Sequence, residues 1–373
     1  MLQWAAVDPA DALLAWYDAH RRDLPWRASG DPYRVWVSEV MLQQTRVETV
    51  LPFYRAFIAR FPAVEDLAAA EVDEVLALWS GLGYYRRARQ LHAAARQVVA
   101  AGGFPRTVDG LRALPGIGAY TAAAVASIAF GIAEPVVDGN VERLLARRLA
   151  QAAGPKSRAG RASLLAASRA LLDPTRPGDS NQAMMELGAT VCTPRRPRCP
   201  LCPLAAGCAA AGEGDPERYP PPRRRRASER QRRVVAVVER RSRVLLFRRP
   251  DDSELLAGTW ELPWFAAAAD GDPVVEGPAA LAAAYGGRWR LGAQLGRVEH
   301  GITFRALEVE IYRAEIAGGD AVAEPPPGVA AAGWFDAEAR RKLPLSALVG
   351  KVLRVARPGA GLPHGPRSGR RRG

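Results

Sequence analysis

Residues 111–131 read LRALPGIGAYTAAAVASIAFG, and this stretch decides how the first half of the chain folds. It predicts a helix that ends near Leu114, a tight turn, and a second helix that begins near Tyr120. Gly116 and Gly118 in the turn let the backbone approach another surface closely. The start of the second helix offers free N–H groups and a positive dipole end, which suit a phosphate. An ordinary corner between two helices is the alternative, which a lone turn of this kind would favour.

The sequence around this hairpin divides into a helical part and a part with strands. Apolar residues recur every three or four positions through residues 1–210. From Val234 the pattern changes: residues 234–249 predict two strands joined by a turn, and residues 306–316 alternate with period two. The expected fold is therefore multidomain, with an all-α domain (1–212), a Pro/Arg-rich linker (213–233), an α+β domain (234–356) and a disordered basic tail (357–373).

Length and composition agree with a two-domain protein that has ordinary cores. The chain has 373 residues, and 48% of them are hydrophobic. There is no run of eighteen apolar residues, so no membrane span is expected. The N-terminus lacks a basic stretch followed by an apolar one, so we expect no secretion signal and a cytoplasmic location, where thiols stay reduced.

The net charge of +13 indicates a polyanionic partner, but its distribution weakens that inference. Residues 223–233 carry a net +6 and residues 357–373 a net +5. Both are interpreted as solvated, flexible charge runs. The folded parts are then nearly neutral, so a specific grip on a polyanion must come from individually placed groups.

All four cysteines lie within seventeen residues, with six, two and five residues between Cys192, Cys199, Cys202 and Cys208. In a reducing compartment this clustering favours metal ligation over disulfides. Structural zinc usually has two closely spaced pairs, and only Cys199–Cys202 has that form. Four thiolates suit an iron–sulfur cluster equally well, so the spacing leaves both metals open.

Three basic residues, Arg195, Arg196 and Arg198, lie between the first two cysteines, and we call them the loop arginines. On a metal-stapled loop they are well placed to meet phosphates. The alternative is that they neutralise the anionic thiolates. Both roles are compatible on so short a loop.

Two carboxylates are candidates for acid–base chemistry. Glu39 is surrounded by the apolar residues of 35–42, and burial there would raise its pKa and make it a proton donor near neutral pH. Asp138 precedes Gly139 and Asn140 at a predicted helix start, where N–H bonds keep a carboxylate ionised. A surface glutamate and a simple N-cap aspartate are the alternatives.

Several segments together resemble the MutY family of adenine DNA glycosylases in the endonuclease III superfamily. They cover most of residues 8–208 and comprise the cysteine spacing, PWR (25–27), SEVMLQQT (38–45), GLGYYRRAR (81–89), LPGIGAYTA (114–122), VDGNVERLLAR (137–147) and NQAMMELGA (181–189). The resemblance implies a helix-hairpin-helix glycosylase domain whose cysteines hold a [4Fe-4S] cluster. It also implies a monomer, nucleoid-associated in a bacterium, that removes adenine opposite 8-oxoguanine or guanine in double-stranded DNA.

The resemblance also implies roles for single residues. Glu39 protonates N7 of adenine and Asp138 stabilises the sugar cation, as paired carboxylates do in sugar hydrolysis. Tyr120 and Asn140 line the pocket, and Glu186 lies near it. Gln44, Leu82 and Tyr84 enter the duplex, although packing on a helix turn is as good an explanation for Leu82 and Tyr84. The other substrate or DNA contacts are expected at Trp26, Arg27, Thr45, Gly116 and Gly118.

Tyr120 separates this chain from its bifunctional relatives, which have a lysine at this position as Schiff-base nucleophile. We therefore expect a glycosylase without strand cleavage. A bifunctional endonuclease III-like enzyme and a non-catalytic DNA-binding or Nudix scaffold are the alternatives.

The C-terminal part is similar to Nudix domains at residues 254–265. A catalytic Nudix helix needs several carboxylates, and residues 277–287 have none, so pyrophosphatase activity is not expected. In the family this domain inspects 8-oxoguanine with a Phe-Ser-His loop after an upstream histidine. Here His300 fits the upstream histidine and Thr303 replaces the serine, but Phe304 stands in place of the reading histidine. We expect weaker discrimination of 8-oxoguanine.

Overall fold

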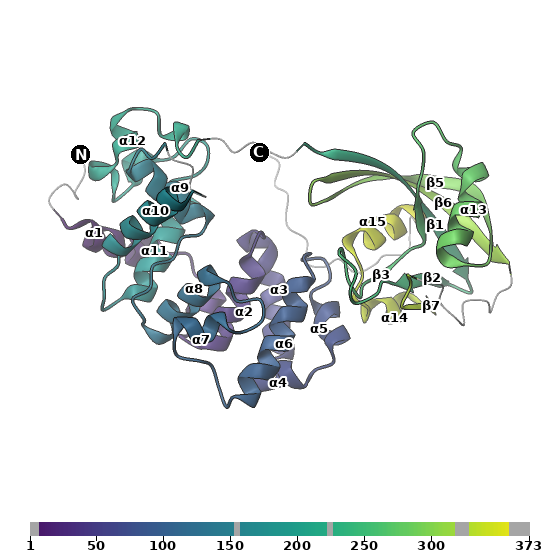
Figure 1. Ribbon diagram of the computed structural model, residues 1–373, viewed down its shortest axis with the longest axis horizontal. Helices are drawn as coiled ribbons and strands as arrows, with labels where there is room; N and C mark the ends of the chain where they lie inside the picture. The colour runs from purple at the N-terminus through teal and green to yellow at the C-terminus, as the bar shows by residue number, and fades with distance from the viewer. Residues whose placement is uncertain (1–6, 153–156, 222–226, 318–327, 358–373) are drawn as a thin grey trace. The chain divides into compact units, whose positions relative to one another are not determined.

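The structure is a computed structural model that describes residues 7–152, 157–221, 227–317 and 328–357. The chain divides into two compact units (Figure 1). The first contains residues 1–44, 61–68 and 93–224, and the second contains residues 45–60, 69–92 and 225–373. The basic tail from residue 358 and part of the arginine-rich segment (222–226) lie outside the described residues.

The first unit is helical, as the sequence predicts. Its helices begin at side chains that accept the free N–H groups of the first turn, such as Asp8 in front of α1 and Ser157 in front of α10. The α-helices of this unit are α1 (Pro9–His20), α2 (Pro32–Leu42), α4 (Val64–Ala69), α7 (Val108–Arg112), α8 (Ala119–Phe130), α9 (Gly139–Arg148), α10 (Arg158–Ala170), α11 (Pro177–Thr190) and α12 (Ala209–Gly212), and α6 (Arg86–Ala100) ends in it. Short 3-10 turns are η1 (Pro25–Arg27), η2 (Cys199–Leu201), η3 (Ala205–Gly207) and η4 (Pro216–Arg218).

The hairpin forms between α7 and α8, which confirms the predicted helix–turn–helix. Leu114 and Ile117 are buried under the turn, whereas Gly116 and Gly118 are exposed. Gly116 has φ +77°, a conformation that favours glycine. Around Gly118 a Cβ atom would meet no heavy atom within 4 Å, so this face of the turn is open.

The helices of the first unit pack closely where α11 crosses its neighbours. A Cβ atom on Gly178 would lie 2.7 Å from the carbonyl oxygen of Ser127 in α8. A Cβ atom on Gly188 would lie 2.8 Å from the backbone oxygen of Asn140 in α9. Only glycine allows these approaches, so α11 holds α8 and α9 at fixed positions.

The second unit combines α3 (Val47–Arg60), α5 (Val72–Leu78) and the start of α6 with a mixed sheet. The sheet has the order β3-β2-β1-β6-β5, with β4 paired to β1 and β7 to β2. Strand β1 runs parallel to β6, and β5 and β6 form a long antiparallel hairpin. The bounds are β1 (Glu229–Arg240), β2 (Arg243–Arg248), β3 (Trp260–Glu261), β4 (Trp264–Ala266), β5 (Arg288–Ile302), β6 (Arg305–Ala317) and β7 (Ala331–Phe335).

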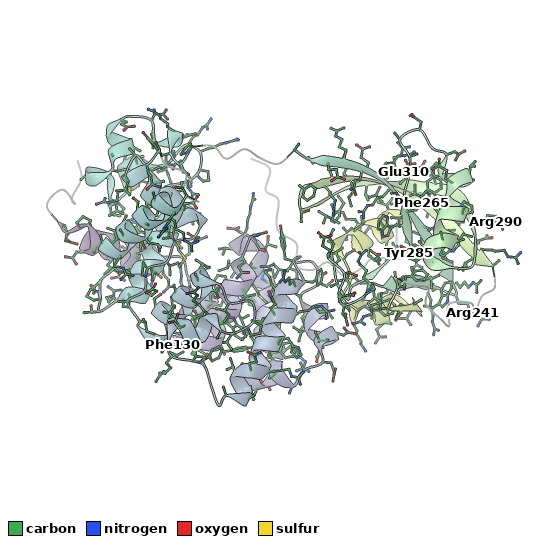
Figure 2. All side chains as sticks on the ribbon, viewed as in Figure 1. Phe130, Arg241, Phe265, Tyr285, Arg290 and Glu310 are labelled. Atoms are coloured by element: carbon green, nitrogen blue, oxygen red, sulfur yellow. The ribbon has the colours of Figure 1, made fainter. Side chains whose placement is uncertain are left out.

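Alternate residues of β1 point to opposite faces of this sheet, and each face has its own helix. Val234, Ala236 and Val238 belong to a core that contains residues of α13 (Pro273–Tyr285), among them Tyr285, which Figure 2 labels. Val235 and Val237 belong to a second core that contains residues of α15 (Ala347–Ala356). A short helix, α14 (Ala337–Arg341), follows β7.

The interpretation of residues 223–233 as a wholly flexible charge run is wrong for its second half. Strand β1 begins at Glu229, because this segment pairs with β6. The Arg232 Nε atom lies 2.7 Å from Oε1 of the buried Glu310 (labelled in Figure 2). The Arg233 guanidinium stacks on Trp264 at 3.9 Å from the ring centroid. These arginines are structural side chains of the sheet.

Among the described residues, no helix is both long enough and apolar enough to cross a membrane.

Candidate active site

Glu39 is the acid around which the site of the first unit is built. It lies on α2 and is only 5% exposed. Burial raises its pKa to about 7, and the negative charge of Asp138 adds to the rise, whereas the bond from Tyr120 and the charge of Arg27 oppose it. Glu39 therefore holds a proton near neutral pH that it can give to a bound group.

Tyr120 links the hairpin to this acid. It lies in the first turn of α8, and its hydroxyl donates a hydrogen bond of 2.6 Å to Oε2 of Glu39. Burial and the nearby carboxylates raise its pKa well above the usual value, so the phenol stays protonated and remains a donor. One residue further on, Thr121 accepts a hydrogen bond of 3.1 Å from Nε2 of Gln43, at the end of α2. The hairpin helix thus contacts α2 at two successive residues.

Asp138 is the N-cap of α9 and the second carboxylate of the site. Its Oδ1 accepts from the backbone N–H groups of Asn140 (2.9 Å) and Val141 (2.7 Å), and its Oδ2 accepts from the Asn140 amide at 3.0 Å. From the sequence, we expected these bonds to keep the carboxylate ionised. Burial outweighs them and raises the pKa of Asp138.

The start of α9 is fixed by groups that the sequence analysis did not single out. Arg143 donates to Oδ1 of Asn140 (3.0 Å) and to the carbonyl oxygens of Gly188 (2.7 Å) and Cys192 (2.8 Å). Asn181 holds the preceding loop by accepting from the backbone N–H of Val136 at 3.1 Å. The position of Asp138 therefore depends on α11 as well as on α9.

Glu186 is buried and forms ion pairs with two arginines. Its Oε1 is 2.6 Å from Arg22 Nε, and its Oε2 is 2.8 Å from Arg27 Nη2. Burial opposes its ionisation, but the hydrogen bonds and charges of Arg22 and Arg27 outweigh burial and lower its pKa. Trp26, adjacent in the chain to Arg27, is 6% exposed. Glu186 holds the PWR segment in place and is no free acid.

The hairpin provides an open backbone surface next to Tyr120. Gly118 is the N-cap of α8 and has no side chain to accept its first N–H groups. Gly116 and Gly118 are both exposed. The backbone N–H groups and the helix dipole at this helix start are of the kind that favours a phosphate, and the anion site stays a prediction.

The four cysteines are free thiols that line one cavity. Burial raises the pKa of Cys202 to about 12, and the neighbouring thiols add to the rise. In the part of the chain that the structure describes, no three His, Cys, Asp or Glu side chains meet closely enough to hold a single metal ion. A cationic centre inside the cavity would favour the four thiolates.

Arg147 fixes the cysteine loop to α9, and the sequence analysis missed it. This arginine is 2% exposed. Its Nη1 lies 3.4 Å from Sγ of Cys192 and 2.7 Å from the Thr193 carbonyl oxygen, and its Nε lies 3.0 Å from the Tyr219 carbonyl oxygen. The spacing of four between Arg143 and Arg147, which places both on one helix face, was the available signal.

The loop arginines are exposed. The backbone N–H of Arg196 donates to Oε1 of Glu217 at 2.7 Å, and the Arg198 guanidinium donates to the carbonyl oxygen of Thr190. The backbone of the loop is thus held from two sides while its charges face outward. The Arg195 carbonyl oxygen accepts from the Thr193 hydroxyl at 3.0 Å.

The structure distributes the predicted duplex contacts over both units. Gln44 belongs to the first unit and has φ +59°. Thr45, Leu82 and Tyr84 belong to the second. Leu82 is only 6% exposed, which supports the packing interpretation because its side chain is covered by protein, whereas Tyr84 is 48% exposed. Of that pair, Tyr84 alone is displayed for contact in this conformation.

The predicted 8-oxoguanine contacts lie at the turn between β5 and β6 of the second unit. His300 is half-buried, and burial together with Lys351 and Arg233 lowers its pKa, so it is neutral at pH 7. Thr303 is exposed and has φ +55°. The Phe304 ring packs under the Arg305 guanidinium at 5.1 Å.

Comparison with known proteins agrees with this site. Residues 37–165 match the family of HhH-GPD superfamily base excision DNA repair proteins, and residues 233–355 match the NUDIX domain family. A human adenine DNA glycosylase is 50% identical over 210 residues, which are 53% of this chain and 38% of that protein. An Arabidopsis thaliana adenine DNA glycosylase is 41% identical over 292 residues, which are 67% of this chain and 46% of that protein. The chain thus spans less than half the length of both relatives.

A solved structure also aligns with the helical part. A thermostable thymine-DNA glycosylase has a TM-score of 0.50 and 29% identity, over 55% of this chain and 95% of that chain. Together, these matches cover both the hairpin with its carboxylates and the sheet that follows. Residues 37–165 are therefore similar to HhH-GPD superfamily base excision DNA repair proteins and residues 233–355 to NUDIX domains, and the chain is similar to adenine DNA glycosylases.

Proposed function

We propose that this chain is a monofunctional DNA glycosylase that hydrolyses the N-glycosidic bond of adenine mispaired with 8-oxoguanine or guanine in duplex DNA. One observation carries the proposal. Glu39 is a buried acid with a pKa of about 7 that accepts a hydrogen bond of 2.6 Å from Tyr120 in the hairpin helix. The negative charge of Asp138 contributes to the raised pKa. The names of the matched relatives supply the base, adenine.

In this mechanism Glu39 acts as the general acid. It gives its proton to N7 of adenine, which makes the base a better leaving group. The C1′–N9 bond then breaks, adenine departs with that proton, and water adds to C1′ and releases a proton. General acid catalysis of this kind contributes about a hundredfold to ten-thousandfold in rate.

Asp138 stabilises the sugar cation that forms when the bond breaks. Its Oδ1 is held by two backbone N–H groups and its Oδ2 by the Asn140 amide. A carboxylate held in place before the reaction stabilises developing positive charge without rearranging. Asn140 helps to hold Asp138 in place through this hydrogen bond, and Tyr120 holds Glu39 through the bond from its hydroxyl.

The absence of strand cleavage rests on the side chain at position 120. A lyase needs an amine that forms a Schiff base with the sugar. Tyr120 supplies a phenol in its place, and residues 1–212 contain one lysine, Lys156, which lies outside the described residues.

DNA contact is assigned to the hairpin, the loop arginines and exposed side chains. Gly116 and Gly118 bring backbone N–H groups to a phosphate, a contact that anchors DNA of any sequence. Tyr84 stacks at the site that the flipped adenine leaves, and Gln44 and Thr45 also contact the duplex. Flipping the base costs a few kcal/mol and is easier at a mispair. The protein then works on genomic DNA as a monomer, in the cytoplasm or at a bacterial nucleoid.

We further propose that Cys192, Cys199, Cys202 and Cys208 hold a [4Fe-4S] cluster. All four line a single cavity, and burial raises the pKa of Cys199 and of Cys202, so a cationic group there would favour their thiolates. Four cysteine thiolates are the usual ligands of such a cluster. When bound, it would staple the loop that carries the loop arginines.

The C-terminal domain is proposed to inspect the base opposite the adenine through His300 and Thr303. Helix α13 has a single carboxylate, Glu276, which is too few for the metal chemistry of a Nudix hydrolase. Because Phe304 replaces a histidine donor, contact with 8-oxoguanine is expected to be weaker than in relatives with that histidine.

The decisive experiment is base release from duplexes with adenine opposite 8-oxoguanine, guanine or cytosine, followed by alkaline cleavage at abasic sites. Release opposite the first two supports the proposal, and no release from any duplex overturns it. Glu39→Gln should reduce release at least about a hundredfold while DNA binding persists. Unchanged release by this variant would show that Glu39 is not the acid.

The bifunctional alternative is tested on an abasic-site duplex with borohydride. An amine nucleophile leaves a covalently trapped protein–DNA adduct, and Tyr120 does not. A strong adduct would replace the present proposal with a bifunctional enzyme.

A further inference from the structure

The turn between α5 and α6 carries an exposed aromatic side chain in an uncommon backbone conformation. Helix α5 ends at Leu78 and α6 begins at Arg86. In the turn, Gly81, Gly83 and Tyr84 have φ values of +103°, +78° and +52°. Glycine adopts such values easily, but a tyrosine keeps them only when its surroundings hold them.

Neighbouring helical residues hold one side of this turn. Trp79 Nε1 and Arg87 Nη2 both donate to the carbonyl oxygen of Gly83, each at 3.1 Å. The Arg87 guanidinium also lies over the Tyr84 ring, 5.5 Å from its centroid. These contacts orient the turn relative to its own helices.

The NUDIX domain holds the other side through one backbone oxygen. The carbonyl oxygen of Leu345 accepts from the Ser80 hydroxyl at 2.7 Å and from the Tyr85 hydroxyl at 2.6 Å. Ser80 and Tyr85 are the residues on either side of the 81–84 turn. Tyr85 is 4% exposed, and burial raises its pKa, so its hydroxyl remains a donor.

Leu345 is itself fixed within the NUDIX domain. It forms a parallel bridge with Trp260, whose backbone N–H donates to the Pro344 carbonyl oxygen at 2.8 Å. Leu345 also packs against the core beneath α15. A displacement of this part of the sheet would therefore move the acceptor of both hydroxyls.

Two ion pairs keep the NUDIX domain against α5 and α6. Arg89 Nη2 lies 2.8 Å from Oδ1 of Asp251, and Arg248 Nη2 lies 3.1 Å from Oδ1 of Asp73. Gly258 leaves room for the first pair, since a Cβ atom there would lie 1.7 Å from Arg89 Nη2. The contact is thus specific on both sides of the 81–84 turn.

We propose that Ser80 and Tyr85 are positioning residues through which the NUDIX domain sets the conformation of Tyr84. The shared acceptor, Leu345, fixes both ends of the turn and so determines where the exposed ring stands. The inference rests on the proposed function, because the ring is taken to stack on a base of the opened duplex, as exposed aromatic side chains do on nucleic acids. The domain that inspects the opposite base thereby also places the side chain that enters the duplex.

The first test needs no DNA. Amide hydrogen exchange is measured on the full chain and on Ser80→Ala/Tyr85→Phe, with Ser80→Ala alone as a milder variant. Exchange at residues 81–85 should become faster in both variants while that of the central sheet is unchanged. Unchanged exchange at the turn would overturn the proposal even if the glycosylase activity is confirmed.

The second test asks whether the two hydroxyls act through Tyr84. The ratio of affinities for a mispaired and a fully paired duplex is measured for Ser80→Ala/Tyr85→Phe, for Tyr84→Ala, and for the triple variant. In the double variant the affinity ratio should fall about tenfold, the size expected for one or two hydrogen bonds. In the triple variant the ratio should be no lower than in Tyr84→Ala alone. An equal additional loss in the Tyr84→Ala background would mean a general structural effect and would reject the positioning role.

Tyr312→Phe is the matched control. It also removes a hydroxyl from a tyrosine of low exposure in the same unit, where that group bonds to Glu310 at 3.4 Å. It should leave both the exchange at the turn and the affinity ratio unchanged. If it lowers the ratio as much as the double variant does, the effect is not specific to Leu345 and the proposal fails.

Discussion

Replacing Tyr120 by phenylalanine should move the pH dependence of base release to higher pH. The change removes the hydroxyl that donates to Glu39 at 2.6 Å. In the original protein, this hydrogen bond lowers the pKa of Glu39. Without it, burial and the charge of Asp138 act against fewer opposing contacts. The pKa of Glu39 should therefore rise above its present value of about 7.

The size of the shift follows from the bond that is lost. A hydrogen bond to a charged group contributes about 1.5–3 kcal/mol, and one pKa unit corresponds to about 1.4 kcal/mol. The protonated carboxyl also accepts from the phenol, so part of the bond is common to both forms. We expect a rise of about one pKa unit, the lower end of that range.

The assay is the single-turnover rate of adenine release from an 8-oxoguanine mispair, measured across pH for the original and variant proteins. Glu39 works in its protonated form, so the rate falls as pH rises through its pKa. In Tyr120→Phe this falling limb should lie about one unit higher, whatever happens to the maximal rate. A limb that stays in place or moves to lower pH would refute the reasoning.

Tyr17→Phe is the control for this measurement. Its hydroxyl is buried in the same unit, and within the described residues it has no hydrogen-bond partner. Removing it should leave the limb unchanged. A comparable shift in this variant would mean that any loss of a buried hydroxyl perturbs Glu39.

Four further predictions concern stability, DNA affinity and lesion choice. The pKa of Glu39 is raised from 4.5 to about 7, so its stabilising contribution is complete below pH 4.5 and is lost as the pH rises through 7. Between those pH values, the free energy of unfolding of Glu39→Gln in urea should increase by about 3 kcal/mol relative to that of the original protein, and a constant difference would contradict this. Glu186→Gln should destabilise the fold by about 3 kcal/mol, because it leaves Arg22 and Arg27 without their carboxylate. Glu74→Gln, which breaks the exposed pair with Arg60, should cost less than about 1 kcal/mol, and equal losses in the two variants would show that burial is irrelevant here. Alanine at the loop arginines should weaken DNA binding and reduce its salt dependence at unchanged iron content, and if both stay unchanged the loop has only a structural role. The preference for adenine opposite 8-oxoguanine over guanine should be modest and should increase in Phe304→His, so a preference of many orders of magnitude in the original protein would sink this expectation.

Much of the fold was predictable because its signals are local. The turn at residues 114–118, the period-two segments of β1, β2 and β6, and the helical periodicity before residue 210 depend on neighbours within a few positions. The first part of β1, residues 229–233, was missed for the same reason. Seven arginines in eleven residues indicate a solvated run, and only the distant β6, with Glu310, turns part of that run into a strand.

The candidate site was predictable in its chemistry but less so in its environment. The hydrogen-bonded carboxylate at the start of α9 was expected, yet the rise in the pKa of Asp138 follows from burial by the surrounding chain. Arg143 and Arg147 were not found, because their partners lie more than forty residues away. Leu82 was an even choice between packing and DNA contact, and its burial favours packing.

Residue type and short spacing were enough to identify the hairpin, the four clustered cysteines, the two carboxylates and the phenol at position 120. Which groups act together depends on how the chain packs. The bond between Glu39 and Tyr120 spans 81 positions, and the Arg22–Glu186 pair spans 164. The contact of Tyr85 with Leu345 spans 260. Pairings of this kind depend on how helices and strands pack, and burial, which sets the pKa of Glu39, exists only once they have packed.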